Sequence, residues 1–324
     1  MASVSARALR SRYAQVDALT LPSHEEALRR VPDFDSVLVD DGVDEGELVA
    51  ELRSRTYDAC VTTWATPRTA RVPQRARIAV RVGQARRLYS WRFTHRVVVR
   101  SEMGDVTTHW SQIMLDYARA LHCDTADAAP RFNPTGEDFA RAGELLQTAG
   151  AARGEYVVLH PTNALAPSRG LWPTEGWARL ARALRERFRL PVLLSGSPFD
   201  TGINARIAQQ AQDADVTDLA GRVGIGAFGA LARDARLFVG ITTGSMHIAA
   251  AVGAPTVGIF PFQTDTPERW APIGPRTALV RATYRCRPGE RKETCPDFAC
   301  VAHLDVPRIL AAADAVISVR ASRE

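Results

Sequence analysis

The segment from Gly240 to Phe260, GITTGSMHIAAAVGAPTVGIF, combines threonines, a glycine and a histidine between two apolar runs. The first run is typical of a buried strand, and the small residues after it are typical of a helix. Unpaired backbone N–H groups and the helix dipole favour a phosphate at such a helix start. Gly244 would let a ligand approach the backbone, and the hydroxyls of Thr242 and Thr243 could donate hydrogen bonds. The segment indicates an anion site, with a purely structural turn as the alternative.

Three other polar, glycine-containing loops border strand-like or helix-like runs in the same half of the chain. Carboxyl ends of parallel strands meet at one edge of a sheet, which is where ligands bind in open α/β folds. Together with the first segment, the loops predict a nucleotide-diphosphate site. Their sequences are LHPTNALAPSRGLWP (159–173), LLSGSPFD (193–200) and DLAGRVGIGAF (218–228).

Strand-like and helix-like runs alternate along the chain, which predicts parallel sheets covered on both faces. Ser23 is expected to cap the helix over residues 23–31. The alternation weakens near residues 123–138, where proline, alanine and asparagine indicate a linker. We therefore predict an α/β fold with two doubly wound domains. Their ranges are 1–125 for the first domain, 126–153 for a linker and helix, and 154–324 for the second domain.

The bulk composition predicts a globular protein, with 46% hydrophobic and 24% charged residues among 324. No secretory leader and no apolar run of roughly 18 residues is evident, so a cytoplasmic location is expected. The five cysteines form an odd count, which favours a reducing compartment. Cys286, Cys295, Cys300 and His303 lack the paired spacing of a zinc site. We predict no metal and no cofactor, with free thiols as the preferred reading.

The charge distribution is strongly uneven. No acidic residue occurs from Ala59 to Ser101, a stretch that holds ten arginines. A surface of one sign attracts phosphate, anionic lipid or nucleic acid, although a solvated basic face is an equally good interpretation. Nucleic acid is the least favoured partner, because the interleaved aromatic residues of a stacking platform are too few. Arg75, Arg77 and Arg81 are predicted to form a basic patch on the acceptor side.

The order of HPTN, LWPTEGWARLARAL, LLSGSPFD, DLAGRVG and TTGSMHIAAA resembles glycosyltransferase family 9, the ADP-heptose:lipopolysaccharide heptosyltransferases. The resemblance covers essentially the whole chain and is densest from Tyr156 to Pro272. It implies the GT-B fold, in which two Rossmann-like domains face each other across a cleft. It also implies that the second domain binds the nucleotide sugar and the first binds the acceptor.

Carried over position by position, the resemblance implies a set of donor contacts. Some would face the phosphates and others the ribose, the base or the diphosphate at the helix start. Thr162 and Asn163, in the loop after the first strand of the second domain, would contact the donor phosphates, and Arg169 would replace the missing lysine as the cation. Asp200 would contact the ribose or the base, and Val223 would line the base pocket. At the helix start, the diphosphate would contact Thr242, Thr243, Gly244 and His247.

The chain departs from the family pattern at three places. Thr242 stands where the family usually has an aspartate, and Gly170 stands where it often has a lysine. The first strand and its Gly-Asp loop, whose aspartate is the family's proposed general base, are not found. We expect that aspartate to lie before Met1, so the chain as printed should transfer little sugar. Loss of a central strand would also leave two unpaired sheet edges.

The implied function is transfer of a sugar, with heptose as one candidate, from a nucleotide-diphosphate donor resembling ADP-heptose. The acceptor would be a hydroxyl of an acidic glycan or a lipid-linked molecule. Peripheral association with the inner face of the cell membrane is a further expectation. Helix N–H groups and side chains can stabilise a leaving diphosphate without a metal. The alternative is a non-catalytic relative that binds sugar nucleotides, which the three departures favour.

Overall fold

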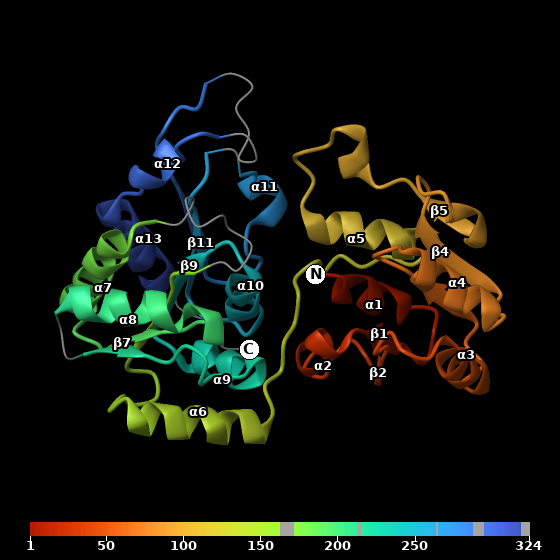
Figure 1. Cartoon of the computed structure of the whole chain (residues 1–324), viewed down its shortest axis with the longest axis horizontal. Coiled ribbons are helices and arrows are strands. Elements are labelled where there is room, and N and C mark those ends of the chain that lie inside the picture. Colours follow the sequence, from red (N-terminus) through yellow and green to blue (C-terminus); the bar gives the residue numbers. More distant parts are fainter. Residues whose placement is uncertain (163–171, 213–214, 264, 288–294, 319–324) are drawn as a thin grey trace. The chain divides into compact units, whose positions relative to one another are not determined.

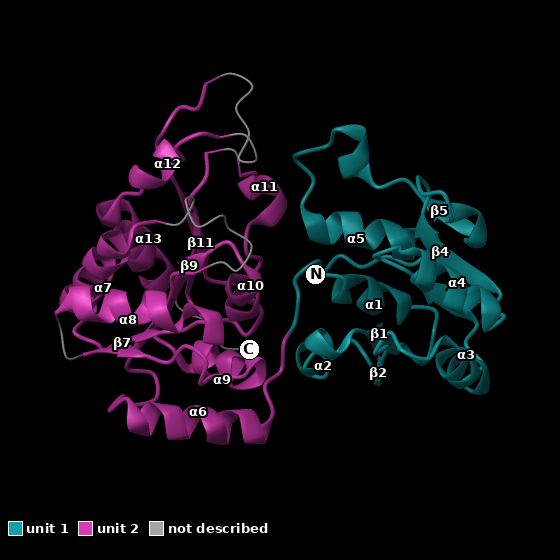
Figure 2. Cartoon of the chain, viewed as in Figure 1, with its two compact units in different colours: residues 1–131 teal, residues 132–324 magenta. Residues whose placement is uncertain are grey.

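We describe a computed structural model of the chain, which covers residues 1–162, 172–212, 215–263, 265–287 and 295–318. Two compact units divide it, unit 1 at Met1–Arg131 and unit 2 at Phe132–Glu324 (Figure 2). The predicted linker and helix over 126–153 therefore span the division between the units. The roles predicted for the two domains stay predictions. Within the described residues, no helix is long and apolar enough to cross a membrane.

Unit 2 is built on one parallel sheet of six strands, in the order β11-β10-β9-β6-β7-β8. The chain begins at the central strand β6, adds β7 and β8 on one side, and then returns to add β9, β10 and β11 on the other. This confirms the doubly wound fold predicted for the second half. The strands are β6 (Val157–His160), β7 (Val192–Leu194), β8 (Val216–Asp218), β9 (Leu237–Ile241), β10 (Thr256–Phe260) and β11 (Thr277–Arg281).

Helices cover both faces of this sheet (Figure 1). Alternate strand residues enter two separate hydrophobic clusters, because successive side chains of a strand point to opposite faces. Leu159 belongs to one cluster and Val158 to the other. The first face carries α7 (Thr174–Phe188), α8 (Thr201–Ala211) and α13 (Val306–Ser318); the second carries α6 (Gly136–Thr148), α9 (Ile225–Asp234) and α10 (Gly244–Ala251).

Short helices complete unit 2: the 3-10 helix η4 (Pro198–Asp200), α11 (Pro267–Trp270) and α12 (Ala299–Ala302). Every residue of β6, β7, β9 and β10 is buried. A fully buried parallel sheet needs near-continuous apolar strands, which explains why these runs were recognisable in the sequence.

Unit 1 contains two separate parallel sheets, β1-β2 and β3-β4-β5. The strands are β1 (Ala18–Thr20), β2 (Val37–Val39), β3 (Ala59–Val61), β4 (Val80–Gln84) and β5 (His95–Val97). The helices are α1 (Ser3–Leu9), α2 (Pro22–Leu28), α3 (Glu45–Ser54), α4 (Pro67–Arg75) and α5 (Trp110–Arg119), with 3-10 helices η1 (Ser90–Arg92) and η2 (Arg100–Met103).

The strands β1 and β3 each pair on one side only within the described chain. All three residues of β3 are half-exposed, in contrast to the buried strands of unit 2. Within the same described residues, the strands β2 and β5 also pair on one side only, so the loss of a central strand between two of these edges stays a prediction. An unpaired edge presents backbone N–H and C=O groups without partners in the sheet.

Side chains cap three of the five α-helices of unit 1, namely α3, α4 and α5, and the first helix of unit 2. Asp44 accepts from the N–H groups of Gly46 and Glu47 at the start of α3, and Thr66 and Thr135 form capping boxes at α4 and α6. The expectation that Ser23 caps its helix is wrong. That helix, α2, begins one residue earlier at Pro22, whose fixed φ suits the first helical position.

Candidate functional site

The first part of the candidate site lies where the order of strands in unit 2 reverses, between β6 and β9. These two strands are paired, with Val157 opposite Leu237 and His160 opposite Gly240. The residues after each strand must therefore emerge side by side. Ligands of doubly wound folds bind at this switch point, beyond the carboxyl ends of the strands.

Two threonine hydroxyls lie at this point without hydrogen-bond partners in the described structure. Thr162 follows β6 and is 3% exposed, and Thr243 follows β9. The Oγ1 atoms of both residues are buried and unpaired. A buried polar group without a partner costs about 1 to 3 kcal/mol, so such groups call for an explanation. A bound oxygen-rich ligand would supply the missing partners.

The start of α10 adds backbone donors to these hydroxyls. Thr243 occupies the cap position, yet its side chain makes no capping hydrogen bond, and the first turn carries no acidic residue. In the same turn, the N–H of His247 donates to the carbonyl of Thr243 at 3.4 Å. Thr242 is half-buried and its N–H donates to the carbonyl of Ile259, which joins it to β10. The uncapped helix start suits an anion.

Gly244 is the first residue of α10 and is exposed. A Cβ atom added there would meet no other atom within 4 Å, and the φ angle lies outside the left-handed region. The backbone angles at this position therefore do not require glycine. What distinguishes the position is open space beside the unpaired N–H groups.

His160 is buried and is the last residue of β6, two positions before Thr162. Its Nδ1 lies 3.0 Å from the hydroxyl of Ser195, which follows β7. Burial lowers the pKa of His160 to about 4, against an opposing effect of Asp200. The imidazole is therefore neutral near pH 7, and its role is to tie two strand ends together.

Asp200 lies at the end of η4 and is buried. Its Oδ2 accepts hydrogen bonds of 2.7 Å from both the N–H and the hydroxyl of Ser197. These bonds fix the loop after β7 and occupy one carboxylate oxygen. The ribose or base contact implied for Asp200 stays a prediction. The hydrogen bonds from Ser197 use Oδ2, so Oδ1 is the oxygen that could make this contact.

The loop after β8 packs against the loop after β7. A Cβ on Gly221 would lie 3.1 Å from the Cα of Pro198, and the φ of Gly221 is +72°, so glycine is required there. Val223 is half-buried beside α9. Phe199, next to Pro198, is 93% exposed. Phe199 is not among the residues predicted from the sequence, where the only signal for it is an aromatic residue between proline and aspartate in a loop expected to be polar.

Asn163 and Arg169, and the departure at Gly170, lie outside the described residues. The remaining implied donor residues all belong to unit 2. The structure brings Thr162, Thr242, Thr243 and Gly244 together at the switch point, and it places Asp200 and Val223 on two adjoining loops.

Comparison with known proteins decides the family. The sequence profile of "Glycosyltransferase family 9 (heptosyltransferase)" matches residues 46–297. The chain belongs to glycosyltransferase family 9. Lipopolysaccharide heptosyltransferase 3 of Escherichia coli is 29% identical over 219 residues, which is 66% of this chain but only 62% of that relative's length.

Solved structures of family 9 share the fold. The E. coli ADP-heptose lipopolysaccharide heptosyltransferase II has a TM-score of 0.78 at 19% identity, covering 98% of this chain and 94% of that one. A family 9 glycosyltransferase from Veillonella parvula has a TM-score of 0.83 at 14% identity, covering 97% and 92%. The E. coli heptosyltransferase WaaC was solved with ADP and has a TM-score of 0.68 at 17% identity, covering 97% and 95%. These likenesses confirm the GT-B fold predicted for this family 9 chain.

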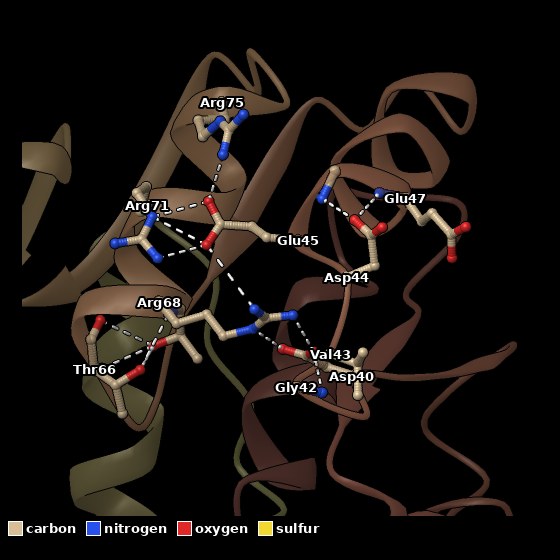
Figure 3. A network of polar contacts seen from close by, with 12 residues as sticks. Asp40, Gly42, Val43, Asp44, Glu45, Glu47, Thr66, Arg68, Arg71 and Arg75 are labelled. Atoms are coloured by element: carbon tan, nitrogen blue, oxygen red, sulfur yellow. Dashed lines mark hydrogen bonds and ion pairs between the residues drawn. The ribbon is translucent and has the colours of Figure 1, made fainter.

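In unit 1 of this family 9 chain, three of the ten arginines of the arginine-rich stretch pair with upstream acids (Figure 3). Glu45, at the start of α3, accepts from Arg71 at 2.5 Å and from Arg75 at 2.8 Å. Asp40 pairs through both oxygens with Arg68, at 2.7 and 3.0 Å. These hydrogen bonds hold the pKa of Asp40 below its usual value and lower the pKa of Glu45 to about 2.

The three residues predicted to form the acceptor-side patch have different surroundings. Arg75 is paired with Glu45. Arg81 donates to the backbone carbonyls of Arg92, Ile78 and Ala79. Arg77 is exposed and has a φ of +61°. A joint acceptor contact by these three residues stays a prediction, but Arg75 and Arg81 already have structural partners.

Proposed function

We propose that this chain transfers a sugar from a nucleoside-diphosphate donor to a hydroxyl of an acidic glycan or a lipid-linked acceptor. The donor binds to the loops of unit 2 at the carboxyl ends of β6, β7 and β9. Family membership supports the reaction class. Structures of WaaC with ADP and with ADP-2-deoxy-2-fluoro heptose support an ADP-heptose-like donor.

The observation that carries the proposal is the set of unused donors at the β6–β9 switch point. The N-terminal end of α10 lacks a side-chain cap, and the hydroxyls of Thr162 and Thr243 are buried without partners. A diphosphate offers several acceptor oxygens and negative charge, so it satisfies both the hydroxyls and the helix end. In the reaction, the same groups would stabilise the leaving nucleoside diphosphate as its charge develops.

The remaining contacts follow from the loops beside this point. Phe199 offers an exposed aromatic face on the loop after β7, which packs against the loop that carries Val223, and this face suits stacking of the nucleobase. Asp200 offers Oδ1 to a ribose hydroxyl. His247, in the first turn of α10, would lie close to the phosphates.

We assign no general base. Asp40 does not suit that role, because Arg68 binds both of its oxygens and holds its pKa low, whereas a base should have a pKa near the working pH. The acceptor is expected to engage unit 1, and the enzyme is expected to act at the inner face of the cell membrane.

Thermal-shift measurement with ADP, UDP, GDP and their sugar conjugates tests donor binding directly. A ligand at about 100 times its Kd adds roughly 2.7 kcal/mol to stability, which is readily measured. We expect ADP and ADP-heptose to raise the melting temperature. A failure of every nucleotide to do so would overturn the proposed donor site.

A non-catalytic function is the second candidate, since Thr242 stands where the family usually has an aspartate. Release of ADP from ADP-heptose in the presence of a lipopolysaccharide-type acceptor separates the two functions. Donor binding without acceptor-dependent release would establish the binding relative in place of the transferase.

A further inference from the structure

Large apolar side chains are exposed on three loops of unit 1, each of which follows a strand of the sheet β3-β4-β5. Leu88 is 100% exposed, Trp64 75% and Met103 64%. Trp91, Val98 and Val106 are also exposed, at 48 to 59%. We name these six residues the apolar rim. Among the described residues of unit 2, only two large apolar side chains are exposed, namely Phe199 and Leu279.

Side-chain contacts hold the three loops of the apolar rim together. The hydroxyl of Tyr89 donates to the carbonyl of Ala65 at 2.5 Å, which joins the loop of Leu88 to the loop of Trp64. Arg87 pairs with Glu102 at 2.5 Å, and Arg86 lies 2.7 Å from the sulfur of Met103. The rim is therefore one surface, since loops that diverged could not make these contacts.

Positive charge surrounds the apolar rim. Arg86 and Arg96 are exposed, and the guanidinium of Arg92 lies 4.2 Å from the centroid of the Trp91 ring, whereas Arg87 is paired with Glu102. Residues 59–101 contain no acidic residue, and the acids that pair with arginines of this stretch are Asp40, Glu45, Glu102 and Asp116. In the described structure, no salt bridge joins Arg86 or Arg96 to any of these acids. Tryptophan and aliphatic residues flanked by arginine are the composition of a surface that enters the headgroup region of a membrane.

We propose that the apolar rim docks unit 1 on a bilayer containing anionic lipids. Leu88, Trp64 and Met103 enter the boundary between headgroups and acyl chains, while Arg86 and Arg96 bind lipid phosphates. Sugar stacking alone would explain the tryptophans but not the exposed Leu88, Met103, Val98 and Val106. The inference extends the proposed function by placing the enzyme where a lipid-linked acceptor resides, and it rests on no residue of the donor site.

Flotation of the full chain with lipid vesicles tests this surface. The vesicles contain phosphatidylcholine alone or phosphatidylcholine with phosphatidylglycerol. The test variant is Trp64→Gln combined with Leu88→Gln, and the control is Leu21→Gln, an exposed apolar residue of unit 1 that precedes α2. Circular dichroism confirms folding, and calorimetry with ADP monitors the donor site in every variant.

We expect binding to the anionic vesicles only, weakening with salt, because screening reduces the attraction between arginines and headgroups. The double variant should bind at least about tenfold more weakly, since two interfacial anchors are removed, and Leu21→Gln should bind as the unaltered chain does. Equal binding by all three proteins, equal binding to neutral vesicles, or binding of a lipid-free acidic oligosaccharide without vesicle binding would each overturn the proposal. If the unaltered chain binds vesicles but does not bind ADP, the proposed donor site is overturned instead.

Discussion

Thr162 shows how one buried hydroxyl can distinguish a binding site from a structural turn. Threonine and valine have nearly the same shape, and a hydroxyl that serves only the fold would have a partner in the fold. The hydroxyl of Thr162 is buried and has none among the described residues. Its presence therefore costs stability in the unliganded protein.

We predict that Thr162→Val leaves the free energy of unfolding unchanged or raises it by up to about 1 kcal/mol, because an unpaired buried hydroxyl is removed. The same change should weaken ADP binding about tenfold, the cost of one hydrogen bond to a charged group. Denaturation and calorimetry on one preparation measure both quantities. A variant that is less stable but binds ADP normally would show that the hydroxyl serves the fold.

A second residue-scale prediction concerns Glu45, whose pKa is lowered to about 2 by Arg71 and Arg75. A carboxyl with a depressed pKa stabilises the fold fully above its ordinary pKa and loses that contribution as the pH falls toward 2. Glu45→Gln should therefore lower stability by about 0.5 to 1 kcal/mol at pH 7, because solvent screens the ion pairs of Glu45 with the exposed side chains of Arg71 and Arg75.

The loss from Glu45→Gln should shrink as the pH is lowered through 4 and nearly vanish close to pH 2. Denaturant titrations of both proteins across this range provide the measurement. A difference in stability that stays constant with pH would mean that the carboxylate charge contributes nothing.

The sequence could not predict which acidic residue pairs with each arginine of α4. The absence of acids from Ala59 to Ser101 predicted local positive charge, but Glu45 and Asp40 reach α4 from 26 to 30 positions upstream. Local sequence carries no information on such partners. Only the packing of α3 against α4 creates them.

Elements differ in how clearly the sequence marks them. The strands of unit 2 are buried throughout, so they form short apolar runs that are easy to recognise. The strands of unit 1 have three to five residues with half-exposed positions, and β4 and β5 were not predicted. The uncapped start of α10 was recognisable from its threonine and glycine content, whereas its open space was visible only in three dimensions.

Hydrogen exchange should follow this difference between elements. Amides of β9 and β10 are buried between two helical layers, and we expect them to exchange slowly, at or near the rate of global unfolding. Amides of β1 and β3 should exchange much faster, because each strand has one unpaired edge and little cover. Mass spectrometry of peptides spanning these strands measures the rates, and equal protection would contradict the two separate sheets of unit 1.

The whole molecule consists of two units with separate hydrophobic cores. Three clusters lie in unit 1 and two in unit 2, and the proposed donor contacts belong to unit 2 alone. ADP should therefore stabilise unit 2 selectively. Calorimetric unfolding with increasing ADP should shift one transition upward, with a smaller effect on the other. Equal shifts of both transitions would show that donor binding is shared between the units.

Isothermal titration of ADP into Gly244→Val shows whether a nucleoside diphosphate binds at the start of α10. A Cβ atom added at Gly244 meets nothing within 4 Å, and the φ angle lies outside the left-handed region, so the variant should fold. Gly136→Val is the matched control. Gly136 is the first residue of α6 and has equally open space around it, but Thr135 caps the start of this helix. We predict that Gly244→Val weakens ADP binding at least about tenfold by filling the phosphate space, while Gly136→Val binds normally. Unchanged ADP affinity in a folded Gly244→Val protein would contradict binding of a nucleoside diphosphate at the start of α10.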